Sequence, residues 1–323
     1  MINRLYLIEA SGTNPTENLA LESVLMDQVN FHEMILYLWQ NDNTVVIGRN
    51  QNVRKECRLN EIKRDGVHLV RRSSGGGAVY HDLGNLNFTF LTDDENYSEE
   101  RQSQIICNAL RQLGIEAERT GRNDILCQGK KFSGNAYYHH NGKSYQHGTL
   151  LIHSDLSKMP MYLQPDPEKY KARGVDSVRS RVTNLADVQP GLTISQVRTA
   201  LIHACEEEYG VSAEPYFWPD ADILAQRTAK FASPEWIYGQ ELPFDTSCEK
   251  RFPWGSLRLE FRVEHGVISH VSVWSDSMEP DIIDVIPELL QGSPFQSEEL
   301  CKKLSVTDHP IYRDLCDLLK EQV

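Results

Sequence analysis

The sequence VRRSSGGGAVYHD, residues 70–82, places three consecutive glycines between two segments of strand character. Apolar and β-branched residues precede it at 67–70, and another strand-like segment follows at 86–91. Because glycine lacks a Cβ and reaches positive φ freely, such a run lets backbone amides approach a ligand closely. Concave arrays of N–H groups bind anions, and Arg71 and Arg72 add donors that suit phosphate or carboxylate. By itself the motif fits a mobile turn equally well.

The composition is that of an ordinary globular protein, with 323 residues of which 40% are hydrophobic and 24% are charged. No apolar run reaches the roughly 18 residues of a membrane span. The first nine residues have the features of neither a signal peptide nor a transit peptide and predict a first strand. The net charge of −13 disfavours nucleic-acid binding. We therefore expect a cytoplasmic protein with neither a nucleic-acid nor a membrane partner.

The seven cysteines are scattered, odd in number and free of any C-x-x-C pair. This distribution argues against a disulfide framework and against a structural zinc site. Cys127 follows two apolar residues, which predicts a buried and inert thiol rather than a nucleophile. No nucleophile elbow is present, so an acyl-enzyme mechanism has little support.

Helix and strand signals alternate irregularly along the first 245 residues. Capping and apolar spacing predict helices at 16–29 (with Thr16 as the cap), 98–113, 195–209 and 220–231. Strands are expected at 35–39, 44–48, 68–72 and 86–91, and the Asn141-Gly142 dipeptide predicts a hairpin over 132–152. The mixture lacks strict βαβ alternation, which favours an α+β fold with a large mixed sheet.

The pattern of predicted strands and helices changes near residue 245. A strand pair at 257–263 and 267–274 is followed by helices expected at 281–290, 297–304 and 310–320. We therefore expect two domains, residues 1–245 and a small α+β domain at 250–323.

A second cluster of glycine and basic residues lies at 121–134, and it is not a P-loop. Asn123 and Asp124 offer oxygen ligands of the kind that Mg²⁺ takes together with substrate phosphates. Lys131 is suited to hold a positive charge over a reacting carbonyl or phosphate. Taken alone, a solvated turn lysine is the simpler interpretation of this residue. His147 beside Gly148 suits ligand contact, although a satisfied sheet histidine explains it as well.

A third cluster carries five basic residues between 169 and 181 and a single acidic one, Asp176. Such a local reversal of charge in an acidic protein indicates an anion site or an ordered, closing loop. A solvated basic loop is equally compatible with it.

Together the clusters resemble lipoate–protein ligase A. The resemblance rests on five motifs in the same order, at residues 71–85, 121–124, 131–137, 147–151 and 177–185. It extends to residues 18–20 and Glu22 near the start and to 236–239, and so covers essentially the whole chain.

The resemblance implies an ATP-dependent lipoate–protein ligase of the biotin/lipoate ligase superfamily. Such an enzyme activates lipoate or octanoate to the acyl-AMP with release of pyrophosphate. It then transfers the acyl group to a lysine ε-amine of a lipoyl domain, on an E2 subunit of a 2-oxoacid dehydrogenase or on glycine cleavage H protein. Residues 1–245 would be the catalytic lipoate- and ATP-binding domain, and 250–323 an accessory domain that shifts between the steps. ATP and Mg²⁺ would be required, with no tightly bound prosthetic group, and the protein would be a monomer.

The resemblance also assigns residues. Lys131 would contact the lipoyl carbonyl and the nucleotide phosphate, and the K-F-S-G register favours it over the adjacent Lys130. The other adenylate contacts would be Arg72, Gly77, Ala78, Val79, Tyr80, Asn123 and Asp124, with Asp124 at Mg²⁺. The lipoate contacts would be Glu22, Gly76, His81, Lys131 and His147, and the basic 169–181 segment would close over the adenylate.

Four alternatives compete with this interpretation. A thioester-using octanoyltransferase needs an acyl-accepting cysteine, and none occurs between Cys127 and Cys205. A lipoyltransferase that takes only preformed lipoyl-AMP stays open, although the H-G-T-L-L motif and the second domain favour the complete ligase. Biotin ligation is disfavoured because its glycine-rich signature differs. A protein that only binds the adenylate is disfavoured because Lys131 stands beside intact phosphate motifs.

Overall fold

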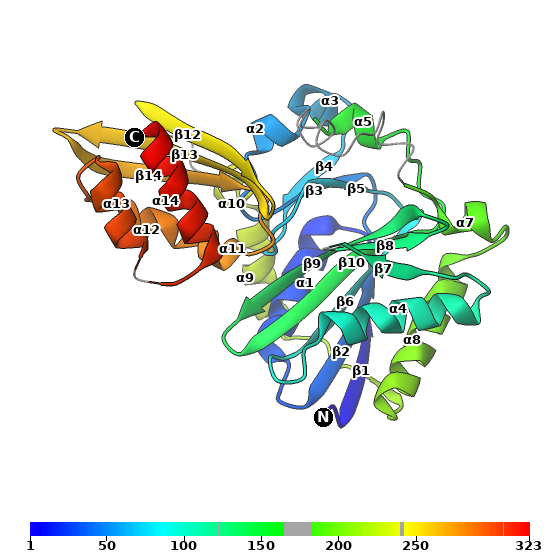
Figure 1. The fold of residues 1–323 in the computed structure, drawn as a ribbon. Coiled ribbons are helices and arrows are strands. Elements are labelled where there is room, and N and C mark those ends of the chain that lie inside the picture. Colours follow the sequence, from blue (N-terminus) through cyan, green and yellow to red (C-terminus); the bar gives the residue numbers. More distant parts are fainter. Residues whose placement is uncertain (122, 165–181, 240–241, 306) are drawn as a thin grey trace. The chain divides into compact units, whose positions relative to one another are not determined.

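The computed structural model describes residues 1–121, 123–164, 182–239, 242–305 and 307–323 (Figure 1). Its internal contacts define two compact units. The N-terminal unit comprises residues 1–46, 54–71 and 78–237, and the C-terminal unit comprises 47–53, 72–77 and 238–323. The glycine-rich loop 72–77 is thus grouped with the C-terminal unit, although it lies early in the sequence. The domain boundary expected near residue 245 stays a prediction.

An eight-stranded mixed sheet forms the centre of the N-terminal unit. In spatial order its strands are β11 (Ala213–Pro215), β1 (Arg4–Glu9), β2 (Glu33–Trp39), β6 (Asn85–Asp93), β10 (Lys143–Leu151), β9 (Lys130–His140), β8 (Asp124–Cys127) and β7 (Glu118–Thr120). Strand β1 runs parallel to both β11 and β2, and the other pairs are antiparallel. The α+β fold with a large mixed sheet is therefore confirmed.

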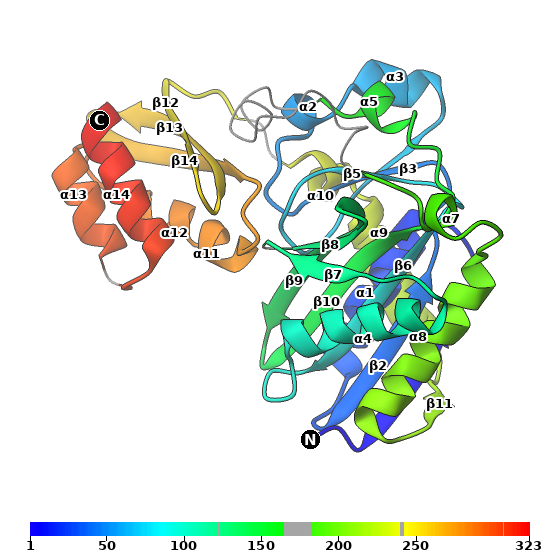
Figure 2. The same cartoon turned by 45° about the vertical axis from the view of Figure 1, so that its right-hand side comes forward.

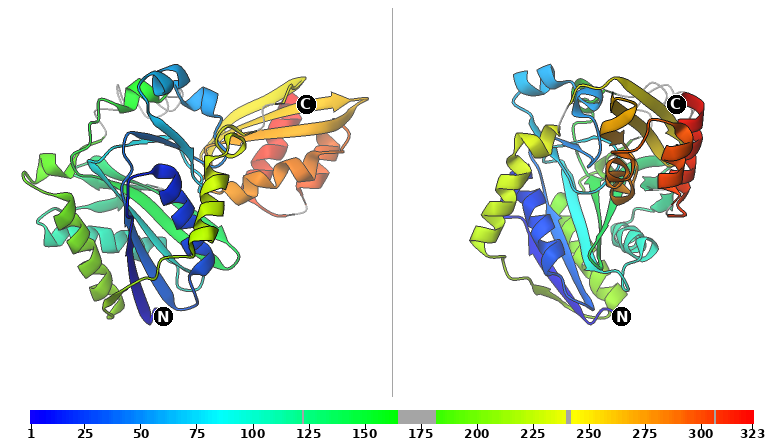
Figure 3. Two further views of the ribbon diagram at one scale, coloured as in Figure 1. Left: turned by 180° about the vertical axis from the view of Figure 1, so that it is seen from behind. Right: turned by 90° about the vertical axis from the view of Figure 1, so that its left-hand side faces the viewer.

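Helices cover both faces of this sheet. Helices α4 (Glu99–Gln112) and α8 (Ile194–Tyr209) lie on one face, as Figure 2 shows. Helices α1 (Pro15–Gln28) and α9 (Ala221–Ala232) lie on the other, seen from behind in Figure 3. Side chains alternate along β6, so Phe88 and Phe90 join the α4–α8 core while Leu91 joins the α1 core. Asn87 and Thr89 consequently face α1.

A three-stranded sheet and several short helices complete this part of the chain. The sheet has the order β4 (His68–Arg71), β3 (Thr44–Ile47) and β5 (Val79–His81). The short helices are α2 (Val53–Glu56), α3 (Leu59–Arg64), α5 (Met159–Tyr162), α7 (Leu185–Val188) and α10 (Pro234–Tyr238).

Local sequence signals account for most of these elements. The hairpin β9–β10 turns at Asn141 and Gly142, whose φ angles of 51° and 76° are the positive values that a type I′ turn requires. Thr16 is wrong as the cap of α1. The helix begins one residue earlier, at Pro15, because the fixed φ of proline suits the first turn. Asn14 is the cap, and its Oδ1 accepts from the N–H of Thr16 at 3.1 Å.

The C-terminal unit packs four helices against a three-stranded antiparallel sheet. Its elements are β12 (Thr246–Phe252), β13 (Gly255–Glu264), β14 (Val267–Ser275), α11 (Pro280–Asp284), α12 (Ile286–Leu290), α13 (Ser297–Leu304) and α14 (Pro310–Gln322). The expectation of two strands misses β12. The single helix expected at 281–290 is also wrong, because Pro287 has no N–H to continue α11 and instead lies in the first turn of α12.

Across the described part of the chain, no helix combines the length and the apolar character that crossing a membrane requires.

Candidate functional site

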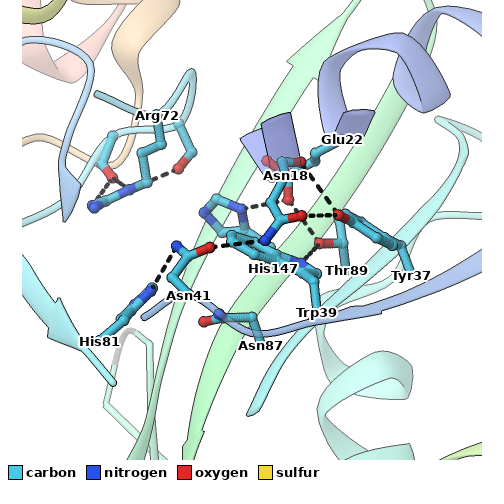
Figure 4. Close-up of polar contacts among 12 residues, drawn as sticks. Asn18, Glu22, Tyr37, Trp39, Asn41, Arg72, His81, Asn87, Thr89 and His147 are labelled. Carbon is cyan, nitrogen blue, oxygen red and sulfur yellow. Dashed lines mark hydrogen bonds and ion pairs between the residues drawn. The ribbon is translucent and has the colours of Figure 1, made fainter. Parts of the chain in front are cut away.

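A buried carboxylate, Glu22 of α1, organises the polar part of the sheet face beneath that helix (Figure 4). Its Oε1 lies 2.8 Å from Nδ1 of His147 on β10 and accepts from Oγ1 of Thr89 on β6 at 2.7 Å. Thr89 in turn accepts from the indole Nε1 of Trp39 at 3.1 Å. The arrangement fixes the orientation of the imidazole.

A second buried chain of polar groups runs beside the first, from β2 to β5 (Figure 4). The hydroxyl of Tyr37 donates to Asn18 at 3.4 Å, and Nδ2 of Asn18 donates to Oδ1 of Asn41 at 3.0 Å. Asn41 Nδ2 lies 3.3 Å from Nδ1 of His81. Burial, followed by the nearby Glu22 carboxylate, raises the pKa of Tyr37 well above its usual value, so this phenol stays a neutral donor.

Lys131 lies at the start of β9 with its side chain 33% exposed. Its Nζ is 2.6 Å from Oδ1 of Asp124, and its carbonyl accepts from the N–H of Thr183 at 2.9 Å. A Cβ added to Gly134 would lie 2.9 Å from this Nζ. The ammonium group therefore lies directly over Gly134, on the side where a Cβ would project.

Five residues form a line across the strands on the face that α1 covers, and we call this line the transverse row. It consists of Asp124 on β8, Gly134 on β9, Thr149 on β10, Asn87 on β6 and Trp39 on β2. Asp124 pairs with Gly134, Thr149 with Asn87, and Asn87 with Trp39. The N–H of Gly134 donates to Oγ1 of Thr149 at 3.2 Å. The row thus connects the position of Lys131 Nζ with the interior of the sheet.

Gly148 explains the glycine of the H-G-T motif. A Cβ at this position would come within 2.7 Å of Phe88, 2.8 Å of Oδ1 of Asn135 and 2.9 Å of the Gly134 carbonyl, all on the α4–α8 side. The glycine lets β10 pack closely there while its neighbours His147 and Thr149 face α1. Its role is local packing that keeps those two side chains in register.

The glycine-rich loop 72–77 belongs to the C-terminal unit and forms several hydrogen bonds within it. The guanidinium of Arg72 donates from Nε to Oγ of Ser74 and from Nη2 to the carbonyls of Gly75 and Gly77, at 2.6 and 2.9 Å (Figure 4). The N–H of Gly76, whose φ is 88°, donates to the carbonyl of Ser277 at 3.0 Å. Arg72 therefore holds the loop's shape, and one loop amide already has an acceptor.

The residues that precede and follow this loop in the sequence belong to the N-terminal unit. Nη2 of Arg71 donates to the carbonyl of Ile237 at 2.7 Å, and Trp236 Nε1 donates to the carbonyl of Arg71 at 2.9 Å. Arg71 thus anchors α10. From the sequence we expected its guanidinium to donate to a phosphate or a carboxylate instead. Ala78 and Val79 are half-buried. The hydroxyl of Tyr80 donates to Asn43 at 3.0 Å, and burial raises the pKa of this phenol.

The two expected metal-site residues differ in their contacts. Nδ2 of Asn123 donates to the carbonyl of Asn135 at 2.9 Å, so its amide braces β9. Asp124 presents a half-exposed carboxylate, paired with Lys131. No group of three or more His, Cys, Asp or Glu residues with metal-binding geometry occurs within the described ranges. The donor set suits a Mg²⁺ ion held by one carboxylate and by substrate phosphates.

The remaining expectations concern the third cluster and the cysteines. Residues 169–181 lie outside the described residues, so the basic loop stays a prediction. All seven cysteines are free thiols. Cys127 is buried, and burial raises its pKa, which agrees with an inert thiol.

Sequence reasoning missed most of the other polar groups on the sheet face that α1 covers and next to it. These are Tyr37, Asn41, Asn87, Thr89 and Thr149, of which Thr89 bonds to Glu22. One signal was available, because residues 85, 87 and 89 are polar and alternate with apolar residues at 86, 88 and 90. Such alternation on a strand that is buried along its whole length indicates a polar site on one face.

Comparison with known protein families identifies the class of protein to which this fold belongs. The chain matches the family model of the lipoyl protein ligase A/B catalytic domain over residues 14–206, and that of the bacterial lipoate protein ligase C-terminus over 241–318. The chain therefore belongs to the lipoyl protein ligase A/B family, and it is an enzyme of protein lipoylation.

Solved structures agree with this family. Plasmodium falciparum LipL1, in complex with lipoate, is 28% identical with a TM-score of 0.87, and the match covers 98% of this chain and 100% of LipL1. A bipartite lipoate protein ligase from Thermoplasma acidophilum, studied with its E2 lipoyl domain, is 29% identical over 75% of this chain and 98% of its own, at a TM-score of 0.65. A lipoate-protein ligase A bound with ATP is 28% identical. The match covers 74% of this chain and 99% of that protein, with a TM-score of 0.65.

Proposed function

We propose that this protein is an ATP-dependent lipoate–protein ligase. In the first step a carboxylate oxygen of lipoate attacks the α-phosphorus of ATP, and the bond to pyrophosphate breaks. In the second step a lysine ε-amine of an acceptor domain attacks the acyl carbon of lipoyl-AMP. The C–O bond to AMP then breaks and the nitrogen loses a proton. Octanoate, which carries the same carboxylate, is the competing substrate.

One observation carries this proposal: the ammonium of Lys131 lies over Gly134 at the half-exposed end of the transverse row. Both steps build negative charge near one carboxyl carbon, first on the α-phosphate and then on the oxyanion of the tetrahedral intermediate. A fixed cation at that point stabilises both transition states without reorganising during the reaction. Asp124 holds the cation in place before substrate arrives.

Mg²⁺ would supply charge neutralisation on the phosphates, with Asp124 as its ligand from the protein. With Asp124 at the ion, Lys131 would be released from its present partner and would bind the α-phosphate and the acyl oxygen. Arg72, Gly77, Ala78, Val79 and Tyr80 are proposed as adenylate contacts, as is Asn123. Gly76 is proposed as a lipoate contact.

The buried polar groups of the sheet face are proposed to form the acyl side of the site. Glu22 fixes the ring of His147, and His81 is held through Asn41. These bonds pre-order the side chains before substrate binds, which lowers the entropic cost of binding. One similar protein was solved with ATP bound, and LipL1 was solved with lipoate. These ligands support ATP and lipoate as the two substrates of this protein.

The acceptor is proposed to be a lipoyl domain, on an E2 subunit or on glycine cleavage H protein. The Thermoplasma ligase was studied with its E2 lipoyl domain, which supports an acceptor of this class. We propose that the protein acts as a monomer in the cytoplasm.

The test combines purified full-length protein with lipoate, Mg-ATP and an apo lipoyl domain. We expect pyrophosphate release and a mass increase of one lipoyl group on the acceptor. Transfer from synthetic lipoyl-AMP without any activity from ATP would instead identify a lipoyltransferase. Failure with both donors would contradict the proposal.

A further inference from the structure

One buried amide on the proposed acyl side has an unused donor. The side chain of Asn87 is 1% exposed, and its Oδ1 accepts from Nδ2 of Asn85 at 2.9 Å. Its Nδ2 has no hydrogen-bond partner among the residues that the structure describes. An unpaired buried donor carries a desolvation penalty that folded proteins rarely leave uncompensated. The neighbouring Thr89, Trp39, Glu22 and His147 bond to one another, so the unused donor points to a ligand.

The position of Asn87 along the transverse row relates it to Lys131. Gly134, over which Lys131 Nζ lies, is separated from Asn87 by the strand β10, that is by two strand spacings. Neighbouring strands lie about 4.8 Å apart, so the separation is about 10 Å. In lipoate four methylene groups separate the carboxylate from the five-membered dithiolane ring. An extended lipoyl chain with its carboxylate at Lys131 therefore brings its ring to Asn87.

Burial changes along the same line. Lys131, Gly134 and Thr149 are half-buried, whereas Asn87 and Trp39 are 1% and 3% exposed. A ligand that lies along the row thus has its charged end near solvent and its tail in the interior. This orientation suits lipoate, whose carboxylate must meet ATP and whose ring is largely apolar.

The chemistry of the ring explains what the donor would recognise. A divalent sulfur is a weak hydrogen-bond acceptor, and it packs favourably against an aromatic ring. Trp39 is the next residue of the row and supplies that ring. The methyl end of octanoate offers no acceptor, so it would leave Nδ2 of Asn87 unpaired. A site that hydrogen-bonds its substrate discriminates against an analogue that lacks the partner group.

We propose that Nδ2 of Asn87 donates a hydrogen bond to a dithiolane sulfur, and that this bond makes the enzyme prefer lipoate to acids without sulfur. The proposal rests on the proposed function, because it assumes that the acyl chain starts at Lys131. It concerns specificity between substrates and leaves the chemistry of adenylation unchanged.

The test measures kcat/KM for pyrophosphate release with lipoate, octanoate and 5-cyclopentylpentanoate, a carbocyclic acid with the shape of lipoate but no sulfur. The wild type should prefer lipoate to the carbocycle by about three- to tenfold, the range that one weak hydrogen bond carries. In Asn87→Leu this preference should disappear, with the activity toward the carbocycle kept or raised. Thr149→Val is the matched control. It lies on the row beside the part that all three acids share, so it should change all three rates alike and keep their ratio.

Several outcomes would overturn the proposal. One is equal kcat/KM for lipoate and the carbocycle in the wild type, which decides the question even if Asn87→Leu does not fold. Another is a loss in Asn87→Leu that is equal for all three acids, which would assign the residue a structural role. If the wild type forms no adenylate, the proposed function fails separately. Calorimetric binding of lipoate and the carbocycle without ATP then tests the bond directly, and equal affinities would refute it.

Discussion

The glycine-rich loop 72–77 and the sheet face beneath α1 both carry polar groups, and these groups are used differently. In the loop, Arg72 donates to the loop's own carbonyls and Gly76 donates to Ser277 within the same unit. On the sheet face, Lys131 is half-buried beside Asp124, and Nδ2 of Asn87 has no partner within the described residues. The Arg72 guanidinium and the Gly76 N–H are thus bonded within their own unit, whereas the sheet face holds one buried donor that lacks a partner among the described residues.

This difference shows that a glycine-rich motif can serve either of two structural roles. The absence of a Cβ permits close approach of a ligand, and it equally permits close approach of another part of the chain. Gly75 serves the second role, because a Cβ there would lie 2.0 Å from the Ser277 carbonyl. The donors of the sheet face occupy ordinary strand positions, and strand register brings them into one row.

The largest expected effect comes from a substitution on the sheet face, at Lys131, and not from one in the loop. Lys131→Ala should lower the rate of adenylate formation by about 10²–10³-fold, because one preorganised charge at the reacting oxygens is lost. Lys130→Ala is the matched control. Lys130 is next to Lys131 in the sequence and its side chain is exposed, so this variant should keep a rate near that of the wild type. Pyrophosphate release under saturating Mg-ATP measures both. Similar rates for Lys131→Ala and the wild type would remove Lys131 from the chemistry.

A smaller effect should distinguish packing from ligand approach within the loop. Gly75→Ala places a Cβ against the Ser277 backbone and should destabilise the protein by about 1–3 kcal/mol, the cost of overpacking. Gly77→Ala meets nothing within 4 Å and should leave the free energy of unfolding nearly unchanged. Urea unfolding, followed by circular dichroism, compares the two variants. Equal stabilities would contradict a packing role for Gly75.

A change in the buried network tests the other region. Thr89→Val keeps the shape of the side chain but removes the hydrogen bonds to Glu22 and from Trp39. The free energy of unfolding should fall by about 1–2 kcal/mol, because Trp39 Nε1 is left unpaired in the interior. Urea unfolding measures this too. A stability at or above that of the wild type would show that the network gives no net stabilisation.

The smallest effect concerns acid stability, which belongs to neither region. Burial tends to raise the pKa of Asp93, but hydrogen bonds from the His32 N–H and from Asn96 outweigh it, and the pKa is lowered from 3.8. The carboxylate therefore stabilises the fold above about pH 3.8, and this contribution is lost as the pH falls through the lower folded-state value. Asp93→Asn should unfold with a shallower dependence on acid pH. An unchanged dependence would contradict this contribution.

Most elements of the fold could be predicted because their signals are local. The Asn-Gly turn of the hairpin and the helix at 297–304 follow from neighbouring residues alone. Strand β12 was missed because charged residues interrupt its alternation at 249–251. The attachment of the glycine-rich loop to Ser277 was missed because two hundred residues separate them.

The candidate site could be predicted in part for the same reason. Motifs identified Lys131, His147 and Glu22, and the structure brings the last two into contact. Asn87 was missed because its unpaired donor depends on burial, and its place beside Trp39 depends on the register of β6 and β2. Neither property can be derived from the residues next to Asn87 in the sequence.

The most direct test is a crystal structure of the full chain with lipoate, in which anomalous scattering locates the two sulfur atoms. We predict the carboxylate at Lys131 Nζ, the chain along the transverse row and one sulfur within hydrogen-bonding distance of Asn87 Nδ2. A lipoate bound on the glycine-rich loop, or with its ring away from Asn87 and Trp39, would contradict it.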